Sequence, residues 1–153
     1  MILGMVPALV LLDQMIKTYV ENHVVKGSEK KLLKGKISIR KVYNKGMCLN
    51  LFEKHPDMVR ILSVIVTVFL TLYTVGSAYF QKRRVAENVG LGLMTAGAWS
   101  NTIDRCFRKY VVDYFGFEAK KDKIRRITYN LGDMFIFAGA ILTVLASIFQ
   151  KNK

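Results

Sequence analysis

The sequence is poor in the side chains that hold metal ions. Its 153 residues include two Cys and two His. Cys48 and Cys106 have no Cys or His neighbour at the spacing of metal ligands, which argues against a zinc site. His23 and His55 lie just outside the hydrophobic stretches, where an imidazole is usually interfacial or solvated.

Acidic residues are also scarce, since 11 Asp and Glu stand against 24 Lys and Arg. Such an excess of positive charge is typical of proteins that bind nucleic acid or an anionic membrane surface. Hydrophobic residues make up 52% of the chain and the mean hydropathy is +0.23. This apolar composition favours the membrane, so we expect membrane lipids and no nucleic acid as partners.

Half of the chain is almost without charge. Four stretches, 1–20, 59–80, 88–103 and 134–149, carry only Asp13, Lys17 and Arg60 as charged residues. A membrane span needs roughly 20 mostly apolar residues, a length that the last two stretches reach when they begin at Ala86 and Asn130. The sequence therefore predicts an all-α integral membrane protein with four transmembrane helices in one domain, residues 1–153. Charges inside the first stretch and the lack of a basic region before it favour a helix over a cleaved signal peptide.

Two long linkers should lie on the same membrane face, because successive spans alternate in direction. These are residues 21–57 and 104–129, whereas the short turn 81–86 and both termini fall on the opposite face. Residues 36–42 are rich in β-branched side chains and are followed by a turn-like Asn-Lys-Gly, which predicts a small sheet. The charged segment 118–126 favours a short surface helix. A functional site is expected on this face.

Several polar residues lie in or beside the apolar stretches, where ionisable groups are costly unless paired or facing a cavity. Asp13 and Lys17 are spaced i and i+4, so they share a helix face and can neutralise each other. The pair can be structural or part of a functional site.

A second polar group ends the third stretch. Asn101, Asp104 and Arg105 share one helical stripe, which can bind a peptide backbone or form an interfacial ion pair that ends the helix. Asn130 and Asp133 open the fourth stretch, where an N-cap and a first-turn acid are the usual reading.

Asp113 interrupts an aromatic and β-branched run, and a carboxylate in such surroundings needs a partner or a raised pKa. If it meets Asp133, the two like charges resist double ionisation and one carboxyl stays protonated near neutral pH. Such a pair can activate water for attack on a peptide carbonyl. The chain has no glycine-rich phosphate loop and no G-x-S-x-G motif, so competing chemistries lack their usual parts.

Read in order, these residues resemble the bacterial lipoprotein signal peptidases, also called signal peptidase II, over nearly the whole chain. The matching segments are 12–17 (LDQMIK), 43–46 (YNKG), 100–105 (SNTIDR) with 111–114 (VVDY), and 129–133 (YNLGD). Together, at this spacing and on these spans, the four motifs are highly specific.

The resemblance implies a membrane aspartyl endopeptidase that needs no metal and no cofactor. It implies that Asp113 and Asp133 are the catalytic pair, and that Asp13 and Asp104 are structural acids, with Lys17 a further structural polar residue. Four residues would bind the substrate backbone or order the pair: Asn44, Asn101, Arg105 and Asn130. The implied substrates are prolipoproteins, cut just before a cysteine that carries a diacylglyceryl group, with no obligate protein partner.

The chain departs from the pattern of this family at four positions. Ser100, Lys109 and Gly132 stand where Gly, Gly and Ala are usual, and Leu49 stands where Phe is usual. None of these changes removes a carboxylate, amide or guanidinium that the chemistry needs. They identify the chain as a divergent member and bear on rate and substrate preference.

Two further readings remain beside the peptidase. One is a non-catalytic four-helix membrane protein that binds lipopeptides or acts as an adaptor, and the other is a small transporter that uses Asp13 and Lys17 as an ion relay. The presence of both Asp113 and Asp133 favours the enzyme over the adaptor. The gathering of polar residues on one face disfavours a continuous transport pathway.

The resemblance places the site at the extracytoplasmic face of the bacterial cytoplasmic membrane, and the charge distribution opposes this. The face with the long linkers carries nine Lys and Arg in residues 21–57 and eight in residues 104–129, against five on the other face. Positive loops usually stay in the cytoplasm. We expect the basic linkers to lie against anionic headgroups instead, with residues 82–84 as the local retention signal.

Overall fold

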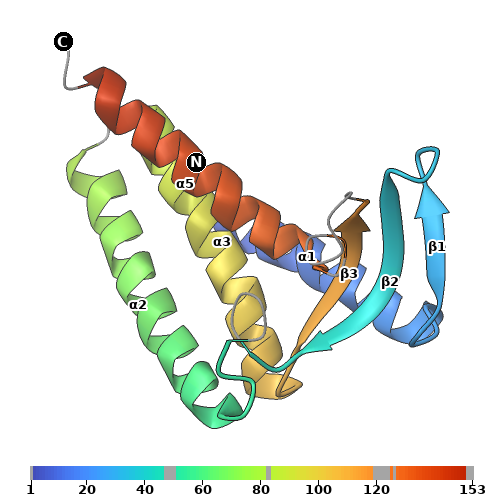
Figure 1. The fold of residues 1–153 in the computed structure, drawn as a ribbon. Coiled ribbons are helices and arrows are strands. Elements are labelled where there is room, and N and C mark those ends of the chain that lie inside the picture. The colour runs from blue at the N-terminus through green and yellow to red at the C-terminus, as the bar shows by residue number, and fades with distance from the viewer. Residues whose placement is uncertain (1, 47–50, 82–83, 119–124, 126, 151–153) are drawn as a thin grey trace.

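A computed structural model describes residues 2–46, 51–81, 84–118, 125 and 127–150. The elements follow the chain as α1 (Ile2–His23), β1 (Glu29–Leu32), β2 (Ile37–Asn44), α2 (Pro56–Phe80), α3 (Val85–Phe107), β3 (Val111–Phe117) and α5 (Leu131–Gln150). In Figure 1, α3 packs against α1, α2 and α5, α2 runs alongside α3 and diverges from α5 toward the lower end, and the sheet stands to one side. The described chain is mostly helical with a small sheet.

Each hydrophobic stretch corresponds to a helix, but the helices extend beyond the predicted limits. α2 begins at Pro56, because proline has no N–H to leave unpaired in the first turn. α3 continues to Phe107. Asp104 and Arg105 therefore belong to the last turns of a helix, as the stripe they share with Asn101 predicts, and not to the linker expected at 104–129.

Two helices in the described part of the chain are long and apolar enough to cross a membrane, α2 and residues Leu131–Phe149 of α5. Only 17% and 11% of their most hydrophobic windows are buried, whereas the core helix of a soluble protein is mostly buried. Large apolar side chains such as Phe69 and Ile141 point outward. The test finds two such helices among the described residues, so a count of four transmembrane helices stays a prediction.

Glycines bring α3 and α5 into backbone contact. A Cβ added at Gly97 would overlap the carbonyl oxygen of Gly132, and one added at Gly139 would overlap that of Gly90. The two pairs are seven residues apart on each helix, so they lie on one face of antiparallel helices. Small residues permit this close approach, which drives helix association in apolar surroundings.

Side-chain hydrogen bonds join α2 to α3. The pairs are Thr67 with Thr102 at 2.8 Å, Thr71 with Trp99 at 2.9 Å, Thr74 with Thr95 at 2.8 Å and Ser77 with Asn88 at 2.6 Å. Polar pairs of this kind hold helices together where the outer surface is apolar. The interface is polar inside and apolar outside, the reverse of a soluble helix pair.

The sheet has the order β1-β2-β3, and all its strands are antiparallel. β2 confirms the strand expected near residues 36–42, but β3 comes from the second linker and pairs Asp113 with Val42. Val112 and Tyr114 of β3 pack on Val20 near the end of α1. The surface helix predicted at 118–126 lies largely outside the described residues.

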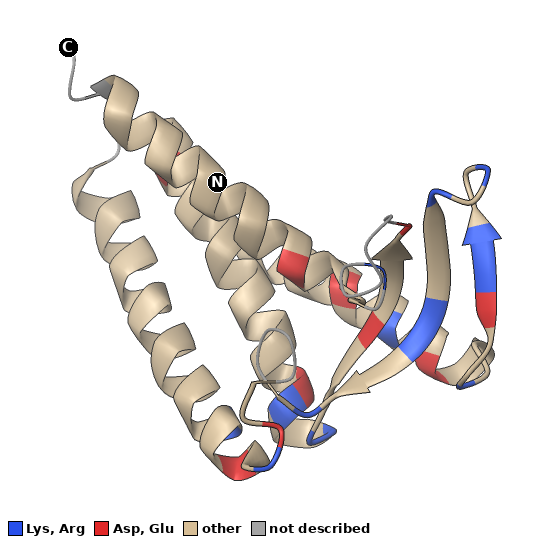
Figure 2. Ribbon diagram, viewed as in Figure 1, with Lys and Arg blue, Asp and Glu red and all other residues tan. Residues whose placement is uncertain are grey.

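The predicted gathering of helix ends on one side is confirmed. Arg105 near the end of α3 donates to the Gly46 carbonyl of the first linker at 2.9 Å, and Asn101 donates to Asp133 in the first turn of α5 at 2.9 Å. Figure 2 shows most charged residues on the sheet and at this end of the helices, with long uncharged lengths of α2 and α5 leading away.

The close contact of α3 and α5 yields a test by glycine substitution. Gly97→Ala should lower the free energy of unfolding by about 1–3 kcal/mol, the usual cost of overpacking, because its methyl group would displace the start of α5. Gly76→Ala in α2 is the matched control, since a Cβ there meets nothing within 4 Å, and it should be neutral. Thermal unfolding in detergent measures both, and equal melting temperatures would contradict the backbone contact.

Candidate active site

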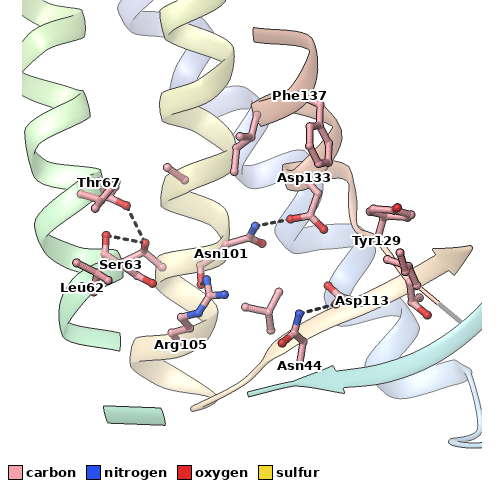
Figure 3. A pocket seen from close by; sticks show the side chains of 17 residues that line it. Asn44, Leu62, Ser63, Thr67, Asn101, Arg105, Asp113, Tyr129, Asp133 and Phe137 are labelled. Carbon is pink, nitrogen blue, oxygen red and sulfur yellow. Dashed lines mark hydrogen bonds between the residues drawn. The ribbon is translucent and has the colours of Figure 1, made fainter. Parts of the chain in front are cut away.

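A cavity of about 360 Å³ lies between α2, α3, α5 and β3. Its polar wall includes both predicted catalytic carboxylates, Asp113 and Asp133, together with Asn44, Asn101 and Arg105. Figure 3 shows these side chains directed toward one another from separate elements. The rest of the lining is largely apolar and includes Leu62 and Val66 of α2 and Ile136 and Phe137 of α5.

Asp113 occupies the middle of β3 and is 3% exposed. Its two carboxylate oxygens accept hydrogen bonds from two side-chain amides, Asn130 Nδ2 at 2.7 Å and Asn44 Nδ2 at 3.1 Å. Asn44 is itself fixed, because its Oδ1 accepts the Gly46 N–H at 3.0 Å. The pairing of β2 with β3 thus brings the Asn44 amide of the first linker to the Asp113 carboxylate of the second linker.

Asp133 lies in the first turn of α5 and accepts two hydrogen bonds. Asn101 Nδ2 donates to Oδ1 at 2.9 Å, and the backbone N–H of Asn130 donates to Oδ2 at 3.1 Å. Asn130 Oδ1 in return accepts the N–H of Asp133 at 2.9 Å. This reciprocal pair is a capping box, so the N-cap predicted at Asn130 is confirmed.

Asn130 links the two carboxylates, a role that its position at a helix start did not reveal. It is completely buried. Its Oδ1 caps α5 while its Nδ2 donates to Asp113. One side chain therefore fixes the start of the helix that carries Asp133 and the rotamer of Asp113.

Burial, and after it the nearby negative charge of Asp133, raise the pKa of Asp113 from 3.8 to about 7. Hydrogen bonds from Asn130 and Asn44 act in the opposite direction because they favour the ionised form. Asp113 therefore holds a proton over much of the neutral range. A protonated and an ionised carboxyl facing one cavity can supply the acid and the base of a hydrolysis.

Arg105 brings a guanidinium to the same wall. It donates to the backbone carbonyls of Gly46 at 2.9 Å and Asn101 at 3.4 Å. Its Nε is buried and has no hydrogen-bond partner in the described part of the chain. Arg105 lines the cavity, so its guanidinium can meet a carbonyl group that enters it.

The predicted pair of Asp13 and Lys17 is confirmed, with 3.0 Å between Nζ and Oδ2 and no exposure of either side chain. Asp104 is a second partner of the ammonium at 3.2 Å. Asp104 does not line the cavity as Asn101 and Arg105 do. It faces away and also binds Arg108 and the backbone N–H of Val112.

Sequence reasoning missed several residues that support the site. Tyr114 donates its hydroxyl to Asp13 Oδ1 at 3.1 Å and accepts the N–H of Leu131 at 2.9 Å. Gln14 donates to Asp104 at 3.2 Å, and Arg108 donates to Thr18 at 2.9 Å. A polar Gln beside Asp13 in an apolar stretch, and a Tyr next to Asp113, were the signals in the sequence.

The structure shows the surroundings of three of the four residues that differ from the family pattern. Ser100 donates to Asp13 Oδ2 at 2.6 Å, and a Cβ added at Gly132 would lie 2.8 Å from that same oxygen. Lys109 has a positive φ of 66°, a conformation in which glycine is favoured. Leu49 and Cys48 lie outside the described residues, and Cys106 is an exposed free thiol.

The described residues contain no group of three or more His, Cys, Asp or Glu side chains that could hold a metal ion. The cavity is instead formed by two carboxyls with amide and guanidinium donors. This set is suited to direct activation of water by the two acids.

Comparison with known proteins identifies the class. The family described as signal peptidase (SPase) II matches residues 5–149, so the chain belongs to this family of aspartic peptidases. It is 30% identical to the lipoprotein signal peptidase of Fusobacterium nucleatum over 95% of this chain and 84% of the relative. It is 29% identical to that of Clostridioides difficile over 95% and 93%.

Two solved structures share the fold. Both are bacterial membrane enzymes. One has a TM-score of 0.84 at 19% identity and covers 98% of this chain and 88% of its own. The other has a TM-score of 0.78 at 20% identity and covers 95% and 90%.

The catalytic roles of the two carboxyls can be tested by isosteric substitution. Asp113→Asn and Asp133→Asn should each lower kcat by at least about 100-fold, because general acid or base catalysis contributes that much, with the fold retained. Asp57→Asn is the control, since this exposed carboxylate pairs with Arg60 on α2 and does not line the cavity. A single substitution at 113 or 133 with near-normal turnover would remove that residue from the pair.

The raised pKa of Asp113 predicts how activity and stability depend on pH. As an acid, Asp113 works when protonated, so kcat/KM should fall as pH rises through about 7. The folded state holds this proton more tightly than the unfolded chain, so its contribution to stability is complete below about pH 4 and is lost as pH rises through about 7. Melting temperatures of wild type and Asp113→Asn at several pH values should diverge accordingly, and parallel curves would contradict the shift.

Proposed function

We propose that this chain removes signal peptides from bacterial prolipoproteins by hydrolysing the bond just before a diacylglyceryl-modified cysteine. The observation that carries the proposal is the cavity in which Asp113 and Asp133 face each other with Asn130 bonded to both. Membership in the signal peptidase II family supports the same activity.

The first chemical step uses the two carboxyls in different protonation states. Ionised Asp133 takes a proton from water, and the resulting hydroxide adds to the scissile carbonyl carbon. Protonated Asp113 gives its proton to the carbonyl oxygen, so the intermediate is a neutral gem-diol. Asp133 is then protonated and Asp113 is ionised.

The second step restores both groups. Asp133 gives its proton to the amide nitrogen, the carbon–nitrogen bond breaks, and the new amino terminus of the cysteine leaves. A gem-diol hydroxyl returns its proton to Asp113 as the carboxylic acid forms. The enzyme ends in the state in which it began, and water is the only co-reactant.

Amide and guanidinium donors around the pair suit an extended peptide. The guanidinium of Arg105 lines the cavity and can donate to a backbone carbonyl of the substrate. Asn44, Asn101 and Asn130 already donate to the carboxylates, so their role is to order the pair.

The apolar wall suits the lipid and the hydrophobic part of the signal peptide. Leu62 and Val66 of α2 face Ile136 and Phe137 of α5 across the cavity. The outer faces of both helices are apolar and exposed. We propose that all four helices span the membrane as one domain, and that substrate enters between α2 and α5 from the bilayer.

The proposed location is the extracytoplasmic face of the bacterial cytoplasmic membrane, because prolipoproteins are cut after export. The hairpin of β1 and β2 carries exposed lysines, including Lys30, Lys31 and Lys34. These can bind anionic headgroups at the outer surface, where each basic residue contributes about 1 kcal/mol.

The substrate is tested with the purified protein and a prolipoprotein prepared with and without its diacylglyceryl group. We expect cleavage of the lipidated form alone, with mass spectrometry locating the cut before the cysteine. Asp133→Asn is the negative control. Binding without cleavage by the wild type would favour the alternative, a lipopeptide-binding membrane adaptor, and cleavage of both forms would exclude the lipid from recognition.

The membrane face is tested by labelling single cysteines in a Cys-free background with a membrane-impermeant maleimide on intact cells. Lys34 lies in the β1–β2 turn and Gln81 follows α2 at the opposite end, and both are exposed. A cysteine at position 34 should react and one at position 81 should not. The reverse pattern would put the site in the cytoplasm, out of reach of exported prolipoproteins.

A further inference from the structure

Lys17 is a buried cation that the proposed mechanism does not use. It lies on α1, its side chain has no exposure, and it does not line the cavity. Four oxygens surround its ammonium: Asp13 Oδ2 at 3.0 Å, Asp104 Oδ2 at 3.2 Å, Ser100 Oγ at 3.1 Å and Asn101 Oδ1 at 2.9 Å. The first two balance its charge, and the last is a neutral amide.

The bond to Asn101 determines which way that amide points. An ammonium only donates hydrogen bonds, so Oδ1 of Asn101 must face Lys17. Its Nδ2 then faces Asp133 and donates to Oδ1 at 2.9 Å. The reversed amide would set N–H groups against the ammonium and an oxygen against the carboxylate, which is unfavourable at both ends.

The same ion cluster also reaches Asp113. Asp104 Oδ2, which binds Lys17, accepts the backbone N–H of Val112 at 3.1 Å. Val112 directly precedes Asp113 on β3. Lys17 is therefore joined through one intermediate residue to Asp133 and through another to the strand that carries Asp113.

We propose that Lys17 is a positioning residue for the catalytic pair: by fixing the Asn101 amide, it holds a hydrogen-bond donor on Asp133 in the geometry that activates water. This assignment rests on the proposed function, because it concerns the rate of the same hydrolysis. A purely structural Lys17 would neutralise Asp13 and Asp104 and would have no effect on kcat through Asn101.

The variant must remove the ammonium without leaving an unbalanced buried charge. Lys17→Met alone would leave Asp13 without its cation, which is strongly destabilising, whereas Asp104 keeps Arg108. Lys17→Met combined with Asp13→Asn removes one charge of each sign and keeps an oxygen for the Tyr114 hydroxyl. Thr74→Val, which breaks a buried hydrogen bond between α2 and α3 away from the cavity, is the control for a loss of packing alone.

The test is a double-mutant cycle on the cleavage of lipidated prolipoprotein. In the double variant Lys17→Met with Asp13→Asn, called the charge-balanced variant below, kcat should fall about 10-fold or more while KM is unchanged. This is the effect of losing a hydrogen bond to a charged group. When the charge-balanced variant is made in an Asn101→Ala background, it should lower kcat no further. Thr74→Val should keep wild-type kcat.

Two results would overturn the proposal. One is a fall in kcat on making the charge-balanced variant that is equal in the wild-type and Asn101→Ala backgrounds. The other is an unchanged kcat in the charge-balanced variant. Lys17→Gln with Asp13→Asn adds a second comparison, because glutamine is neutral like methionine but keeps a donor, and it should retain more kcat than the methionine variant. Equal kcat values would point to charge balance alone. Failure of the wild type to cleave would count against the proposed function, independently of these comparisons.

Discussion

The arrangement of the site depends on the ion pairs that the buried ammonium of Lys17 forms. A lone charge in apolar surroundings is costly, so Lys17 must be paired. It takes Asp13 from its own helix and Asp104 from α3. Because Asp104 also binds the N–H of Val112, the requirement to neutralise one lysine joins two helices and a strand directly beneath the cavity.

Two kinds of helix contact complete the frame. Glycines let α3 and α5 touch through their backbones, so Asn101 and Asp133 lie within hydrogen-bond distance. α2 is joined to α3 by hydroxyl and amide pairs such as Thr67 with Thr102. Thr67 and Thr102 both line the cavity, so this pair holds α2 beside the catalytic carboxylates.

Two of the four departures from the family pattern lie beside one oxygen, Asp13 Oδ2. Ser100 donates to Asp13 Oδ2, and Gly132 leaves room beside it. A hydroxyl added on α3 and a methyl group missing from α5 therefore meet at the same acid. Lys109 has no comparable compensation in the structure, since its positive φ disfavours a side chain.

The sequence by itself determined the helical stretches, the face on which polar residues gather, and the pairing of Asp13 with Lys17, because each follows from local composition or from a spacing of four residues. Tertiary structure alone decided the rest. The strand from the second linker, the bond from Asn130 to Asp113 and the orientation of the Asn101 amide involve partners far apart in the chain. No spacing encodes such contacts, which depend on how helices and strands pack and on which buried polar groups must find partners.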